Sequence, residues 1–237
     1  MTRSTRRAAI ALVAFAMFAG LIALGTWQVQ RRTWKLDLIE RVDARVHAPP
    51  VAPPARERWT LINAANDEYR HVQVSGRFTP DADTFVQAVS ERGAGFWVLT
   101  PLKLADGSVL LVNRGFVPPE LRGRVAPVTG PTTVTGLLRV TEPDGGFLRR
   151  NEPATDRWFS RDVQAIATAR GLANVAPYFI DADAGPVDAS TPPIGGLTVI
   201  AFANNHLVYA ITWYTLGLMV AAGAWRLMRE ERRAEHD

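Results

Sequence analysis

The residues best suited to ligand chemistry lie where a polar segment meets an apolar one, in Asn204-Asn-His-Leu-Val-Tyr-Ala-Ile-Thr-Trp-Tyr214. On a helix, Trp213 lies on the face of His206, and Tyr209 or Ala210 shares that face. A neutral imidazole is a common metal ligand, and neighbouring aromatic rings suit a flat apolar molecule with a metal centre, such as a haem. From these residues alone, the simpler interpretation is an interfacial histidine bonded to lipid headgroups or to the two asparagines before it.

Several other classes of chemistry are excluded by residue content. The chain has no cysteine, which rules out disulfides, thiolate zinc sites, iron–sulfur clusters and thiol-based copper transfer. The motifs G-x-S-x-G, H-E-x-x-H, Walker A and G-x-G-x-x-G are absent, so the sequence predicts no enzyme and no catalytic residues. The net charge of +4 does not predict nucleic-acid binding, because the arginines are scattered and several flank apolar segments.

The apolar run that positions His206 is long enough to cross a bilayer. Residues 207–225 carry no formal charge, close to the roughly 20 residues that a membrane-spanning helix needs. Arginines follow this run in the tail 226–237, whereas residues 171–203 before it contain no Lys or Arg. The positive-inside rule therefore predicts a cytoplasmic tail and an extracytoplasmic position for His206.

A second apolar run, residues 8–27, follows a short basic segment, residues 1–7. It exceeds the usual length of a signal-peptide core, and no suitable cleavage site follows it, so we expect an uncleaved anchor. Two spans with a cytoplasmic C-terminus require a cytoplasmic N-terminus. The result is a multi-pass helical hairpin, with residues 28–206 outside the membrane. Small residues in each span allow close packing within the hairpin or self-association, namely Ala16, Gly20, Gly217 and Ala221.

The first helix is expected to continue beyond the membrane. Apolar residues at helical spacing run from Trp27 to Val46, and the proline-rich segment 47–55 then forms a stiff connector. The cations on the other face of this extension are best interpreted as interface anchors, with anion binding as the alternative; they include Arg31, Arg32 and Lys35.

The middle of the chain predicts an α+β domain, with an antiparallel sheet or small barrel and one packed helix over residues 162–170. Alternating or continuous apolar residues, with turn signals between them, predict strands at 69–78, 84–89, 96–104, 108–113, 132–140, 157–160 and 177–181. Arg114 and Gly115 follow one of these runs. A strand that ends there would present the guanidinium to a ligand, whereas the alternative is an ion pair inside the sheet.

Three segments resemble the surfeit-locus family of cytochrome c oxidase assembly proteins. They are Leu24-Gly-Thr-Trp-Gln-Val-Gln-Arg31 with its continuation through Ile39, Val109-Leu-Leu-Val-Asn-Arg-Gly-Phe-Val-Pro118, and the segment 204–214. Phe116 stands where that family typically has Trp, which keeps an aromatic residue.

The resemblance implies a bacterial inner-membrane protein with two helices and a periplasmic domain, which assists the biogenesis of the haem–copper oxidase. It further implies handling of haem a for insertion into, or stabilisation of, subunit I, with haem a synthase as a further partner. The second-helix histidine of that family is His206 here. The hypothesis is that His206 transiently ligates the haem iron, that Tyr209 and Trp213 pack against the macrocycle, and that Arg31, Arg32 or Lys35 meets its propionates.

Other functional classes compete with this hypothesis. A cofactor-free scaffold would hold oxidase subunits by packing of its membrane helices. A membrane-tethered sensor would need a cytoplasmic output module, and a hydrolase would need a nucleophile or metal site that the sequence does not display.

Overall fold

The computed structural model describes residues 3–146, 149–185, 192–198, 200, 202 and 204–233. The chain forms two compact units. One comprises Met1–Arg41 with Ala201–Asp237 and is helical, and the other is the β-rich domain Val42–Ile200.

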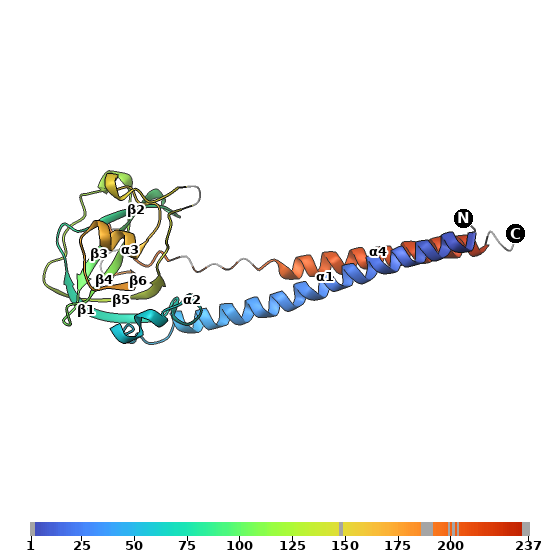
Figure 1. The fold of residues 1–237 in the computed structure, drawn as a ribbon, viewed down its shortest axis with the longest axis horizontal. Helices are drawn as coiled ribbons and strands as arrows, with labels where there is room; N and C mark the ends of the chain where they lie inside the picture. Colours follow the sequence, from blue (N-terminus) through green and yellow to red (C-terminus); the bar gives the residue numbers. More distant parts are fainter. Residues whose placement is uncertain are drawn as a thin grey trace. The chain divides into compact units, whose positions relative to one another are not determined.

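The helical unit consists mainly of two long helices that run side by side, with the start of α1 and the end of α4 at the same end (Figure 1). Helix α1 spans Arg3–Val46 without interruption, as the apolar stripe predicted, and α4 spans His206–Arg233. Both helices are long and apolar enough to cross a membrane. The exact membrane limits remain a prediction.

Close packing between α1 and α4 depends on glycine. A β-carbon at Gly25 would lie 2.5 Å from the Tyr214 ring, so the ring occupies space that any other residue would fill. A β-carbon at Gly217 would lie 3.4 Å from Ile22 and 3.6 Å from Leu21, so Gly217 faces α1 and is a packing residue of the hairpin. Gly20 has no such neighbour, since a β-carbon there would meet nothing within 4 Å.

The β-rich domain is a small barrel of mixed strands. Its strands are β1 (His71–Phe78), β2 (Thr84–Ser90), β3 (Gly93–Lys103), β4 (Val109–Val117), β5 (Pro131–Val140) and β6 (Val175–Ala182). They follow the order β1-β5-β6-β4-β3-β2, and a further pairing of β1 with β3 closes a five-stranded barrel with β2 attached outside. The predicted α+β class and small barrel are confirmed.

One strand pair departs from the predicted antiparallel arrangement. Strands β4 and β6 are parallel, because the chain passes through β5 and helix α3 before it returns alongside β4. Strand β4 is therefore covered on both faces and buried along almost its whole length. This explains why its sequence is a continuous apolar run instead of an alternating one.

Alternate side chains of the barrel strands divide between two hydrophobic cores. The first contains residues from all five barrel strands, including Val72, Leu110 and Ile180, and fills the barrel. The second lies between the outer face of the barrel and α3, and includes Leu111, Phe179 and Ile166. Successive residues of β4 and β6 thus point to opposite cores, as the two-residue period of a strand requires.

The helices of the domain are short. Helix α3 (Val163–Ala169) matches the predicted helix, and the Asp162 side chain caps it by accepting a hydrogen bond from the backbone of Ala165. The sequence did not predict α2 (Ala64–Asp67) or the 3-10 helices η1 (Arg56–Leu61), η2 (Pro119–Leu121) and η3 (Pro153–Thr155).

The strand predicted at residues 157–160 is wrong. Trp158 makes only an isolated bridge to Val86, and it is fully buried. The backbone N–H groups of Phe159 and Ser160 donate instead to the Asn151 side chain, at 2.8 and 3.1 Å. A side-chain acceptor thus replaces the neighbouring strand, and the local apolar pattern reflects the core position of Trp158.

Candidate functional site

His206 is the first residue of α4, and its side chain turns toward α1. Its Nδ1 lies 2.7 Å from Oε1 of Gln28. The histidine and the glutamine are both half-buried. An amide oxygen only accepts hydrogen bonds, so Oε1 facing Nδ1 favours the tautomer that is protonated on Nδ1 and carries its lone pair on Nε2.

The asparagines before His206 differ in their surroundings. Asn205 is exposed, and its backbone carbonyl accepts a hydrogen bond from the backbone of Tyr209. The Oδ1 atom of Asn204 is buried and has no hydrogen-bond donor within the described part of the chain. Burial of an unpaired acceptor costs about 1–3 kcal/mol, so a hydrogen-bond donor that reached this oxygen would lower the free energy.

The aromatic residues predicted beside His206 are not equally placed. Trp213 is half-buried, whereas the Tyr209 side chain is 53% exposed. Ala210 is the buried member of this turn. The aromatic residue that packs on α1 is Tyr214, whose hydroxyl lies 3.3 Å from the Thr26 hydroxyl.

The three predicted cations lie one to two turns beyond Gln28 on α1. Arg32 and Lys35, four and seven positions after Gln28, share its side of the helix and are half-buried. The Lys35 ammonium group lies 5.0 Å from the centre of the Phe202 ring, close in sequence to His206. Arg31 is exposed, and its guanidinium carbon lies 4.1 Å from the centre of the Trp34 ring, which suits an interface anchor.

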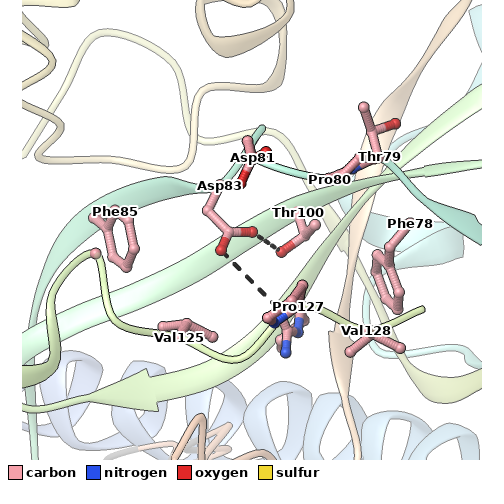
Figure 2. Close-up of a pocket in the computed structure, with 12 residues that line it drawn as sticks. Phe78, Thr79, Pro80, Asp81, Asp83, Phe85, Thr100, Val125, Pro127 and Val128 are labelled. Carbon is pink, nitrogen blue, oxygen red and sulfur yellow. Dashed lines mark hydrogen bonds and ion pairs between the residues drawn. The ribbon is translucent and has the colours of Figure 1, made fainter.

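A second polar site lies in the domain, in a cavity of about 250 Å³ (Figure 2). Arg114 lines this cavity, with a nitrogen 4.0 Å from Asp83 and a 2.9 Å hydrogen bond to the carbonyl of Ala126. Burial lowers the pKa of Arg114, and Asp83 opposes that shift only in part. Figure 2 shows Asp83 facing Thr100, whose hydroxyl donates to it at 2.5 Å.

The prediction that the strand ends at Asn113 is wrong, because β4 continues through Val117. Gly115 has a positive φ of 130°, and a β-carbon there would overlap the backbone of Ile194. The glycine therefore permits a neighbouring segment to pair with β4, and it does not form a turn.

A buried charged network surrounds Asp181 in β6. Its carboxylate, in a side chain only 3% exposed, accepts hydrogen bonds from Asn113 (2.8 Å), Arg139 (2.9 Å), Arg161 (3.0 Å) and Thr198 (3.0 Å). Burial opposes the charge of Arg139, but Asp181 and Glu68 outweigh it and raise the pKa of the guanidinium above its usual value. The carboxylate is thus fully paired with protein donors, which indicates a structural role.

The remaining described histidines, His47 and His71, form hydrogen bonds or ion pairs with residues of the β-rich domain. His47 lies in an exposed pair with Asp43. His71 in β1 places Nε2 2.9 Å from Asp183 and Nδ1 2.8 Å from the carbonyl of Ala48. Burial lowers the pKa of His71, yet the bonds to Asp183 and Ala48 outweigh it and raise the pKa above 6.5.

Comparison with known proteins decides the family. Residues 15–218 match the SURF1 family. Surfeit locus protein 1 of Rattus norvegicus is 38% identical over 221 residues, which cover 84% of this chain and 69% of that protein. The chain belongs to the SURF1 family. Surfeit locus protein 1 of Homo sapiens is also 38% identical, over 217 residues and with coverage of 81% and 69%. The SURF1-like protein of Monosiga brevicollis is 34% identical over 224 residues, with coverage of 88% and 83%.

Membership of the SURF1 family places the chain among the cytochrome oxidase assembly factors, which are non-enzymatic. Its two candidate membrane spans agree with a membrane protein of that family. The predicted protein class is therefore confirmed.

Two residues of the helical unit were missed by sequence reasoning, although both lie in the segments that carried the SURF1 family resemblance. Gln28 is an uncharged amide at the end of an apolar span, where a polar group is rare and costly. Gly25, one turn earlier, indicated a close helix contact but not its partner. Only the register between α1 and α4 shows that they meet His206 and Tyr214.

Proposed function

We propose that this SURF1 family protein binds haem a transiently at the start of α4 and delivers it to subunit I of cytochrome c oxidase or stabilises it there. Iron in a bound haem accepts a nitrogen lone pair as an axial ligand. The observation that carries the proposal is the 2.7 Å contact between His206 and Gln28, since an Nδ1–H donated to the amide oxygen would leave the Nε2 lone pair for the iron.

The residues around His206 fit such a ligand. The buried Asn204 oxygen supplies an acceptor for a polar substituent. Trp213 and the exposed Tyr209 offer apolar surface on the same helix. On α1, Arg32 and Lys35 offer positive charge for carboxylates, and Arg31 can leave its exposed stacking contact to do the same. The binding groups are few and partly exposed, which suits a protein that must release its cargo.

We further propose that both chain ends are cytoplasmic and that the β-rich domain lies on the periplasmic side of a bacterial inner membrane. The arginines that follow residue 225 support a cytoplasmic C-terminus, and two membrane spans then return the N-terminus to the same side. His206 would then lie at the outer surface of the bilayer, where subunit I and haem a synthase are accessible.

The test is to produce the full chain together with haem a synthesis, purify it in detergent and record its absorbance spectrum. We expect wild type and His47→Ala to carry haem, and His206→Ala to lose most of it. His47 is the matched control, because its side chain is 73% exposed and pairs with Asp43, four residues earlier in the chain. If His206→Ala retains as much haem with an unchanged Soret band, the ligand assignment is wrong.

The scaffold function remains a second candidate because the helix pair has an open apolar groove. This groove of about 400 Å³ is lined by Ala9, Ile10, Val13, Ala14, Met17, Val220, Ala224 and Leu227. It offers a packing surface for a partner helix. A scaffold would co-purify with oxidase intermediates even when haem a synthesis is deleted, whereas a haem carrier would not.

A further inference from the structure

We infer that Gln28 is a positioning residue that holds His206 in the Nδ1-protonated form and so reserves Nε2 for the haem iron. The part of this inference that concerns haem iron rests on the proposed function. The protonation pattern of the ring, in contrast, is a property of the protein without haem and can be measured separately.

The geometry of the contact supports this role. Gln28 and His206 are 178 positions apart in the chain, so their hydrogen bond exists only when α1 and α4 are packed together. Both side chains are half-buried, which limits competition from water. A histidine that binds a metal through one nitrogen almost always donates its other ring N–H to a protein acceptor, and this acceptor sets the ring orientation.

The packing beside this pair fixes the helix register. Gly25, one turn before Gln28, lies against the Tyr214 ring, and Thr26 lies within 3.3 Å of the Tyr214 hydroxyl. These contacts leave little freedom for α1 to slide along α4. The amide of Gln28 therefore meets the imidazole as part of a rigid arrangement, which is what a positioning residue requires.

The choice of an amide over a carboxylate has a chemical consequence. A carboxylate behind the imidazole would make the ring a stronger ligand, and it would bring a negative charge into a partly buried site of membrane helices. The neutral amide orients the ring without that charge. Gln28 thus favours coordination that is directed but weak enough for haem to be passed on.

The first experiment measures the ring directly in the full chain, in detergent and without haem. Nitrogen-15 NMR of histidine-labelled protein at about pH 8 distinguishes the two neutral forms of the ring, and His206→Ala identifies the relevant signals. We expect an Nδ1-protonated ring in wild type and a mixture of both forms in Gln28→Leu. Gln28→Glu should keep the wild-type form, because a carboxylate can only accept.

The second experiment titrates the same variants with ferric haem a and follows absorbance. Loss of an outer partner of a metal ligand typically lowers affinity about 10- to 100-fold, so we expect that loss in Gln28→Leu. Gln28→Glu should bind at least as tightly as wild type. Gln30→Leu is the matched control, since Gln30 is an exposed glutamine of the same helix and should leave both measurements unchanged.

Three results would overturn the inference: an Nε2-protonated ring in wild type, an unaltered ring in Gln28→Leu, or equal haem affinity of Gln28→Leu and wild type. The proposed function fails in a different way. If His206→Ala binds haem as well as wild type while Gln28→Leu still changes the ring, His206 is not the ligand and Gln28 sets the ring form without serving haem.

Discussion

Replacement of Asp181 by Asn should destabilise the β-rich domain more than any comparable surface change. The substitution keeps the size of the side chain but removes a charge that is 97% shielded from solvent and that two arginines contact at 2.9 and 3.0 Å. Both guanidinium groups are themselves largely buried, at 15% and 12% exposure. The network would therefore keep two buried cations after losing the carboxylate at its centre.

The expected size of the effect follows from these contacts. Removal of one partner from a buried ion pair costs about 3–5 kcal/mol. The lower end applies here, because Arg139 keeps its 2.6 Å bond to Glu68, Arg161 keeps Glu142, and the new amide oxygen still accepts. A loss of about 3 kcal/mol corresponds to a decrease in Tm of roughly 6–12 °C for a domain of this size.

The assay is thermal unfolding of the full chain in detergent, followed by near-ultraviolet circular dichroism at about pH 8. Asp183→Asn is the matched control, since it makes the same chemical change two residues later. Asp183 is 43% exposed and its ion-pair partner is His71, so its replacement should cost at most about 1 kcal/mol.

The reasoning fails if Asp181→Asn lowers Tm no more than Asp183→Asn does. An increase in Tm would be a stronger contradiction, because it would mean that burial of the carboxylate costs more free energy than its hydrogen bonds return.

Two further changes test other parts of the structure. Gly25→Ala should destabilise the helix pair by about 1–3 kcal/mol, because its methyl group would lie 2.5 Å from the Tyr214 ring. Gly20→Ala, which has open space around it, should instead be neutral or stabilise the helix by up to about 1 kcal/mol. Unfolding of both variants in detergent measures the two effects. The pKa of His71 is raised in the folded protein, so its pairing with Asp183 should stabilise the fold below about pH 6.5 and lose that effect as pH rises. The Tm difference between wild type and His71→Gln should therefore shrink from about pH 5.5 to pH 8, and a constant or growing difference would contradict this.

Local patterns were sufficient for much of the architecture. Apolar length indicates both long helices, and the stripe from Trp27 to Val46 predicts that α1 continues to Val46, because helical periodicity depends only on neighbouring residues. Turn signals and alternation placed six of the seven predicted strands. The seventh, at residues 157–160, failed because the backbone there bonds to the Asn151 side chain, a partner that no local pattern specifies.

The candidate site shows the same limit. The motif around His206 pointed to the candidate ligand, since an imidazole at the mouth of an apolar helix is unusual in any sequence. It could not show that Tyr209 is exposed or that Tyr214 packs on α1, because residues at helical spacing can face either the neighbouring helix or the surroundings.

The sequence alone determines that this chain has two apolar helices, a β-rich middle domain, no cysteine chemistry and one histidine suited to a ligand at the start of α4. The tertiary structure decides which partners its polar groups find. Asp181 meets residues from β4, β5 and the segment after β6, and His206 meets Gln28 across 178 positions of chain. Such contacts depend on strand order and helix register, which are set by the packing of the whole chain and are not encoded in any local segment.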